Sequence, residues 1–158
     1  MIVFLIAAQM AAQPSPTLWR DIKAGMTPSQ VQALYPQGQD RKNRMWVVKK
    51  YPVLPQCPAS VDIHYERGNV ESVKLSGAPS VGGGCSALIR EALLTRYGQP
   101  IEAQDQRSFQ DQRFGLNNDT LLWARDGVTV KFHRVGDIGM NGPSWTMEYS
   151  VVGSTVDL

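Results

Sequence analysis

The chain has 158 residues, a length that predicts a single domain able to bury its own hydrophobic core. Its formal net charge of +2 and its 42% hydrophobic content exclude a disordered polyelectrolyte. The same small charge excludes the strongly basic balance of nucleic-acid-binding proteins, so we expect no nucleic-acid partner.

The first residues predict export. Met1–Ala8 is an apolar run that is followed by small residues and then by Pro14 and Pro16. Such a run is far shorter than the roughly 20 residues that span a bilayer, but it fits the apolar core of a secretory signal. We expect residues 1–13 to be a signal peptide and the protein to be periplasmic or secreted, with no transmembrane segment. A buried N-terminal strand is the alternative interpretation.

The first helix is predicted to begin at Thr27, which is followed by Pro28 and by Gln30. A Thr cap, a Pro at the first helical position and a Gln three residues after the cap form a typical helix start. Val31 and Leu34 follow at helical spacing. The element is expected to end before Pro36.

Three strands are expected next. Residues 45–51 form an apolar and basic segment, and residues 61–65 alternate between apolar and polar side chains. Residues 73–75 continue this alternation after a three-residue loop at 67–69. Around the first of these strands lies a basic cluster, which consists of Arg41, Lys42, Arg44, Lys49 and Lys50. We expect a solvated surface there, and contact with an anionic membrane surface or an acidic partner is the alternative.

The second half repeats the pattern. A helix is expected at 86–97, with Gly98 as its C-cap. Residues 101–118 are polar and predict a long loop or an irregular strand. Asp126-Gly127 is a strong hairpin signal, and it predicts that Trp123 pairs with Val130 across the turn. An alternating strand at 145–151 follows.

This order predicts an α+β fold, in which residues 14–158 form one domain. The domain would consist of two tandem units, each a helix followed by three strands, at residues 19–78 and 85–153. The apolar stripes of the helices and the alternating strands require each other. Both helices are therefore expected to pack on one face of an antiparallel sheet.

The first helix also carries a family resemblance. Ile22–Thr27 reads I-K-A-G-M-T and is followed by Val31 and Leu34. The segment resembles the opening of the SmpA/OmlA (BamE) outer-membrane-assembly lipoproteins and of the beta-lactamase-inhibitor-protein-like superfamily. The resemblance implies a helix-plus-strands unit, used singly or in tandem, and a role in binding another protein. No cysteine follows the apolar run here, so the resemblance does not extend to a lipid anchor.

Cys57 and Cys85 are the two cysteines of the chain. An even pair beside loop residues in an exported protein predicts a disulfide bond, and two free thiols are the alternative. Two cysteines without nearby histidines are too few ligands for a structural metal, so we expect no metal. Without a nucleotide-binding glycine motif we also expect no cofactor.

No catalytic residues are predicted, because neither histidine has a nucleophile or an orienting partner near it in the sequence. The sheet face away from the helices is instead expected to be open and to bind a partner. Its predicted partner-binding residues are Trp46, Lys131, His133 and Glu148. We therefore expect an exported, non-enzymatic module that contacts another protein or the cell envelope. The alternatives are an inhibitor of a secreted enzyme and, with least support, a hydrolase.

Overall fold

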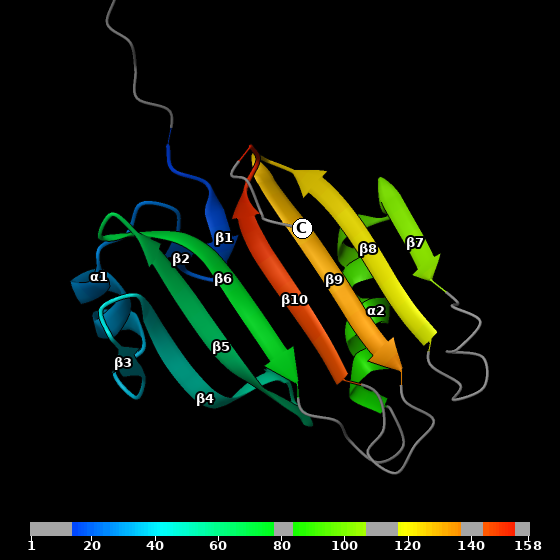
Figure 1. Ribbon diagram of the computed structural model, residues 1–158, viewed down its shortest axis with the longest axis horizontal. Helices are drawn as coiled ribbons and strands as arrows, with labels where there is room; N and C mark the ends of the chain where they lie inside the picture. Colours follow the sequence, from blue (N-terminus) through cyan, green and yellow to red (C-terminus); the bar gives the residue numbers. More distant parts are fainter. Residues whose placement is uncertain (1–13, 78–83, 107–116, 137–143, 154–158) are drawn as a thin grey trace, which may run out of the picture.

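The computed structural model describes residues 14–77, 84–106, 117–136 and 144–153. Its main body is one eight-stranded antiparallel sheet in the order β3-β4-β5-β6-β10-β9-β8-β7, and β1 and β2 form a separate two-stranded sheet (Figure 1). The strands are β1 (Thr17–Trp19), β2 (Ile22–Lys23), β3 (Gln39–Arg41), β4 (Met45–Leu54), β5 (Cys57–Glu66), β6 (Asn69–Gly77), β7 (Glu102–Gln106), β8 (Asn117–Arg125), β9 (Val128–Gly136) and β10 (Ser144–Val151). The helices are α1 (Pro28–Leu34) and α2 (Gly84–Tyr97).

The predicted fold of two tandem helix-plus-three-strand units is wrong. Eight strands form one continuous sheet, and two more strands form a second sheet that the sequence patterns did not indicate. The main sheet has β3 and β7 at its edges. All three residues of β3 are exposed, and β7 has the polar sequence EAQDQ. Neither segment alternates between apolar and polar residues, so these edge strands gave no signal in the sequence.

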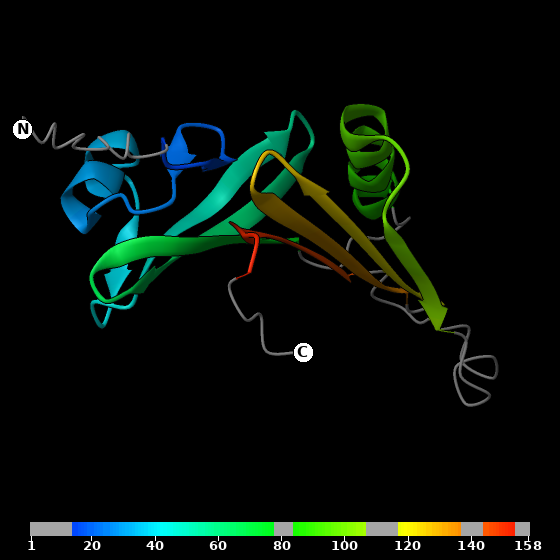
Figure 2. The same ribbon diagram turned by 90° about the horizontal axis from the view of Figure 1, so that it is seen from above.

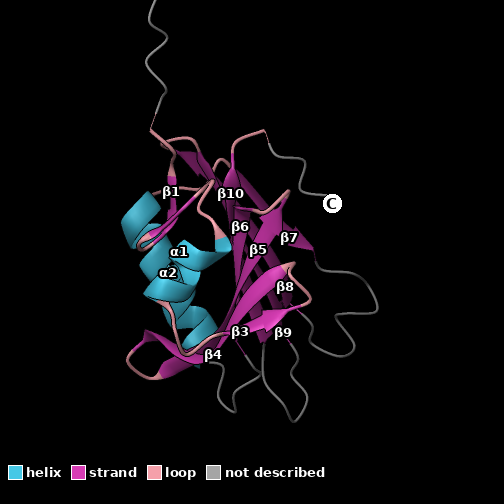
Figure 3. Ribbon diagram, turned by 90° about the vertical axis from the view of Figure 1, so that its left-hand side faces the viewer, coloured by secondary structure: helices cyan, strands magenta, loops and turns pink. Residues whose placement is uncertain are grey.

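Both helices lie on the same side of the main sheet (Figures 2 and 3). The start of α1 is as predicted: Pro28 is its first residue, and the backbone N–H of Thr27 donates to Gln30 Oε1 at 2.9 Å. The end of α2 is also as predicted. Gly98 has a φ of +76°, and its N–H donates to the carbonyl of Leu94 at 2.9 Å.

The segment before α1 is attached to β6. Gly25 has a φ of +80°, and its N–H donates to the carbonyl of Val70 at 2.8 Å. The N–H of Val70 in turn donates to the carbonyl of Met26 at 2.8 Å. Gly25 and Met26 therefore make a turn that joins the sheet, and Thr27 caps the helix that begins at Pro28.

The core lies between the helices and the sheet, and it is built by alternate residues of the central strands. Ile63, Val73, Leu75, Phe132 and Trp145 are almost inaccessible. The hairpin at Asp126-Gly127 has the predicted register, with Trp123 opposite Val130. Alternation and turn chemistry agree there, so one face of each strand is buried.

The connection between β5 and β6 differs from the predicted three-residue loop. The turn consists of Arg67 and Gly68, which both have positive φ. A two-residue turn alone would place the apolar residues of the two strands on opposite faces. A β-bulge that leaves Glu71 outside the paired residues corrects this, so that Ile63 lies opposite Val73.

Helix α2 is attached to the sheet at both ends. The predicted disulfide is confirmed, because Cys57 of β5 and Cys85 of α2 are bonded, with their Cα atoms 5.5 Å apart. At the other end, Trp123 Nε1 donates to the carbonyl of Gly98 at 3.0 Å. These two attachments hold the helix across β5 and β8, which lie in different halves of the sheet.

Two predicted segments fall at least partly outside the described residues. The signal segment 1–13 lies wholly outside them. Of the polar segment 101–118, β7 and the start of β8 are described, whereas residues 107–116 are not. Neither helix in the described part of the chain is long and apolar enough to cross a membrane.

Candidate binding surface

The face of the main sheet that points away from α1 and α2 is called the open face here. Figures 2 and 3 show that no described helix covers it. Its side chains alternate with those of the core, and most of them are half-exposed. Its central members are Asp62, His64, Lys74, Leu122, Lys131, His133, Thr146 and Glu148.

Four charged residues of the open face form a row across four neighbouring strands. Asp62 lies opposite Lys74, Lys74 lies opposite Glu148, and Glu148 lies opposite Lys131. We call these four residues the charged row. Their signs alternate, so each charge has an opposite charge on the adjacent strand, an arrangement that favours cross-strand attraction.

Apolar residues extend the charged row in both directions. Val47 of β4 lies opposite Asp62, and Leu122 of β8 lies opposite Lys131. Since neighbouring strands are about 4.8 Å apart, the distance from Val47 to Leu122 is roughly 24 Å. Leu122 is half-exposed, whereas Val47 is only 9% exposed. The accessible apolar side chain at the β4 end is therefore the half-exposed Met45, which lies on the same face of that strand.

His133 lies beside this row on the open face. Its Nδ1 and the Thr120 Oγ1 of the neighbouring strand are hydrogen-bonded at 2.9 Å. The bond fixes the orientation of the imidazole ring. Both side chains are half-exposed.

Trp46 does not belong to the open face, although it was among the predicted partner-binding residues. It pairs with Ile63 on the helix side and is 9% exposed. Its Nε1 donates to the carbonyl of Tyr35 at 2.9 Å, and its indole ring occupies the space where a side chain on Gly38 would lie. The segment is apolar on both faces, so alternation alone did not reveal that Val47 is the outward residue.

The five residues of the basic cluster are all exposed, but they occupy two places. Arg41, Lys42 and Arg44 surround the turn between β3 and β4, where Lys42 has a φ of +55°. Lys49 and Lys50 lie at an irregularity within β4. Lys49 is five residue steps along the strand from Arg44, a distance of roughly 16 Å. The cluster is therefore two small basic sites along one side of the sheet.

Carboxylates gather near one end of the open face. Burial raises the pKa of Glu71, and a hydrogen bond with Glu66 and the negative charges of Glu66 and Glu148 raise it further. Glu71 is the bulged residue of β6, so the bulge brings it toward Glu66. The end of the open face near the β5–β6 turn is thus more acidic than the centre.

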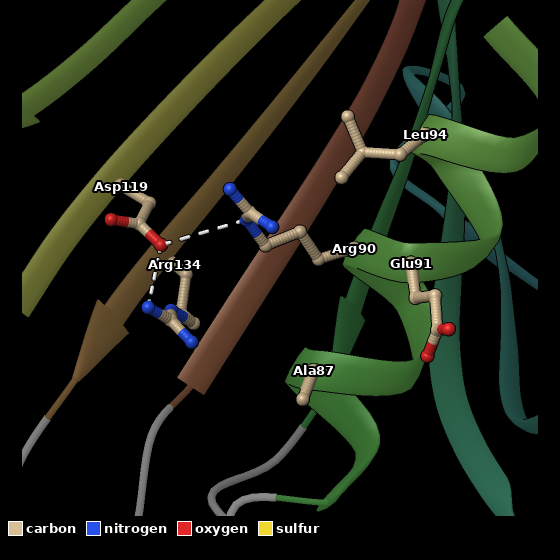
Figure 4. A pocket seen from close by; sticks show the side chains of 6 residues that line it. All are labelled: Ala87, Arg90, Glu91, Leu94, Asp119 and Arg134. Atoms are coloured by element: carbon tan, nitrogen blue, oxygen red, sulfur yellow. Dashed lines mark hydrogen bonds and ion pairs between the residues drawn. The ribbon is translucent and has the colours of Figure 1, made fainter. Parts of the chain in front are cut away.

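A pocket of about 390 Å³ lies on the helix side, between α2 and the sheet (Figure 4). Asp119 is held between two arginines: Arg134 Nη2 donates to Asp119 Oδ2 at 2.5 Å, and Arg90 Nε lies 3.9 Å from the same oxygen. Figure 4 shows both guanidinium groups converging on this carboxylate from β9 and α2. Asp119 pairs with both arginines and so connects the helix to the sheet, and Glu91 supplies a second negative charge at the same pocket.

Among the described residues, no group of three or more His, Cys, Asp or Glu side chains could hold a metal ion. No protein-family model, no curated protein and no solved structure matches the chain.

Proposed function

We propose that this protein is an exported, non-enzymatic binding module that contacts another protein through its open face. The observation that carries the proposal is the charged row on an uncovered sheet face, with the half-exposed Met45 and Leu122 near its two ends. A protein that only needed a solvated sheet would require neither the apolar ends nor an ordered alternation of charge.

The alternating signs favour a protein partner. Asp62 and Glu148 balance Lys74 and Lys131, so the charged row has no net charge. A polyanion such as nucleic acid is attracted by a patch of uniform positive charge, which this face lacks. A partner protein can present charges of both signs in the complementary order, and such complementarity determines partner choice and orientation.

The apolar ends supply contact area. Interfaces concentrate their binding energy in a few well-packed anchors with polar residues around them. Leu122 is half-exposed on the open face, with the exposed Ala124 on the same strand. Met45 is likewise half-exposed on the same strand as Val47. The open face is therefore an amphipathic surface with two anchor regions.

Export is supported by the disulfide between Cys57 and Cys85, because disulfides persist in oxidising compartments. Thiol labelling of unfolded, non-reduced protein purified from its native host tests this. We expect no labelled thiol. Two labelled thiols per chain would contradict export.

The location of binding is tested by site-specific photo-crosslinking in the native host. A benzophenone amino acid replaces Leu122 on the open face in one variant and Leu88 of α2 in another. Leu88 is 38% exposed on the opposite side of the molecule and serves as the matched control. We expect one discrete crosslinked protein from position 122 and none from position 88. The same crosslink from both positions, or from position 88 alone, would contradict the proposal.

A second experiment asks whether the charged row recognises that partner. Lys131→Gln/Glu148→Gln removes two opposite charges from the row and leaves the net charge unchanged. The control, Lys49→Gln/Glu91→Gln, removes two exposed charges elsewhere. We expect the first variant to bind the crosslinked partner at least tenfold more weakly, with an unchanged melting temperature. Equal affinity for both variants would exclude the charged row as the recognition element.

A further inference from the structure

A second pocket, of about 350 Å³, lies on the helix side of the sheet, opposite the open face. It is bounded by β1, by the last turn of α2 and by the β8–β9 turn. The N-terminal segment closes against that turn, because a side chain on Gly127 would contact Pro16. Three elements distant in the sequence therefore build one site.

Positive charge dominates this pocket. It is lined by three arginines, namely Arg20 in the turn between β1 and β2, Arg96 of α2 and Arg125 of β8. Asp126 is the one carboxylate among the described lining residues, and its side chain is 90% exposed. Its Oδ2 lies 3.5 Å from Nε of the neighbouring Arg125. Three guanidinium groups and one peripheral carboxylate leave the pocket with an excess of positive charge.

Arg20 is held in position by aromatic side chains. Its Nη1 donates to the Tyr51 hydroxyl at 3.0 Å, and its guanidinium lies 5.2 Å from the ring centroid of Trp19 and 5.0 Å from that of Tyr51. Its backbone has a φ of +50°, a conformation that a non-glycine residue rarely adopts. A cation oriented in advance loses little conformational entropy when an anion binds.

Beneath the arginines the pocket is apolar. Leu18, Val128 and Val130 line it and are each less than 10% exposed. The half-buried Tyr97 adds an aromatic ring to the wall, and the Arg96 guanidinium lies 5.4 Å from the centroid of that ring. Small-molecule sites combine an apolar lining with a few oriented polar groups, in volumes of roughly 300–1,000 Å³.

We propose that this pocket binds a small organic anion, namely a carboxylate or phosphate monoester attached to a ring or a short hydrocarbon chain. The anionic group contacts Arg96 and Arg125 at the rim, with Arg20 beside them. Guanidinium groups bind carboxylates and phosphates with charge-assisted, often bidentate hydrogen bonds. The apolar body of the ligand rests on Leu18 and Val128.

The pocket in Figure 4 is a poorer anion site, although it also contains two arginines. Asp119 already accepts a hydrogen bond from Arg134 and lies near Arg90. An entering anion would have to compete with this fixed carboxylate, whereas Asp126 at the rim of the second pocket is free to turn into solvent.

Isothermal titration calorimetry at low ionic strength tests the proposal with phenyl phosphate, benzoate and inorganic phosphate as probes. Low ionic strength is chosen because salt screens exposed charges. The variants are Arg96→Gln and Arg125→Gln, with Arg44→Gln as the matched control at an exposed arginine in the β3–β4 turn, at an edge of the sheet. Arg20 is left intact because it also contacts the Trp19 ring.

We expect saturable binding of phenyl phosphate or benzoate, tighter than that of inorganic phosphate. Each pocket variant should weaken it about tenfold, and Arg44→Gln should not change it. Comparison of the two organic probes identifies the preferred anionic group. The absence of saturable binding for both, or an equal loss in Arg44→Gln, would overturn the proposal. Because the open face is on the other side of the sheet, either outcome leaves the proposed protein-binding function intact.

Discussion

Asp119 is a single carboxylate shared by two guanidinium groups, and its removal is expected to destabilise the protein. In Asp119→Asn, Arg90 and Arg134 lose the negative charge between them, while both Nε atoms remain buried without a protein acceptor. The three side chains are partly exposed, so solvent offsets part of the loss. We expect the free energy of unfolding, measured with urea, to fall by about 1–2 kcal/mol.

Asp126→Asn is the matched control for that substitution. The Asp126 side chain is 90% exposed, and its pair with Arg125 is a surface contact of the kind that contributes little to stability. Its φ of +52° suits asparagine as well as aspartate. We expect nearly unchanged stability. An equal loss in both variants would show that the interaction around Asp119 has no special structural role.

At the level of elements, the contact between β6 and β10 joins the two halves of the sheet. Gly77 of β6 lies opposite Trp145 of β10, and a Cβ on Gly77 would collide with the indole of this buried tryptophan. Gly77→Ala therefore forces Trp145 out of its position. We expect a loss of about 1–3 kcal/mol in the free energy of unfolding, measured with urea and tryptophan fluorescence.

Gly84→Ala tests whether that loss comes from the collision or from the glycine substitution in general. Gly84 is the first residue of α2, and no atom lies within 4 Å of the site of an added Cβ. Alanine has the higher helix propensity, so we expect unchanged or slightly increased stability. A loss in Gly84→Ala as large as in Gly77→Ala would contradict the packing argument.

The disulfide is the covalent attachment of α2 to β5, and it closes a loop with a sequence separation of 28. In the chain-entropy model, a loop of this length stabilises the folded state by about 3.6 kcal/mol. We expect Cys57→Ser/Cys85→Ser to lose stability of this order in urea unfolding. Wild-type protein under reducing conditions should approach the stability of the variant. Identical stability of oxidised wild type and variant would contradict this role.

Local chemistry made some elements predictable from the sequence. Thr27 and Pro28 begin α1, and Asp126-Gly127 forms the turn of the β8–β9 hairpin. The signal for each of these features lies within a few residues of the sequence. The short edge strands could not be found in this way. Strands such as β3 exist because their backbone groups pair with a neighbour, and that pairing leaves no apolar pattern in the sequence.

The candidate site was predictable only in part. Alternation placed Lys131, His133 and Glu148 on one face, and the structure has them there. The charged row also requires Lys74 to lie beside Glu148, across strands that are distant in the sequence. The arginine pocket depends in the same way on the packing of β1 near α2. Register and packing between distant elements are tertiary properties, and no local pattern specifies them.

The stability of the whole molecule is expected to be sensitive to alkaline pH, because the hydroxyls of Tyr35 and Tyr65 are partly buried. Burial, together with Tyr51, raises the pKa of Tyr35 to about 12, and burial, together with Asp40, raises the pKa of Tyr65 to about 12. In the unfolded chain both ionise near pH 10. The folded state therefore holds these protons more tightly, and it loses that advantage as the pH rises.

The sign of the effect follows from linkage. The stabilisation is fully present below about pH 10 and is lost as the pH rises from there through about 12, on the order of 2 kcal/mol for each tyrosine. Urea unfolding at pH 9, 10 and 11 measures the decline. Tyr65→Phe and Tyr35→Phe should each make it shallower, because the missing hydroxyl cannot ionise. Lysine titration occurs in all three proteins and cancels in the comparison. A decline of the same steepness in wild type and both variants would show that Tyr35 and Tyr65 do not control alkaline unfolding.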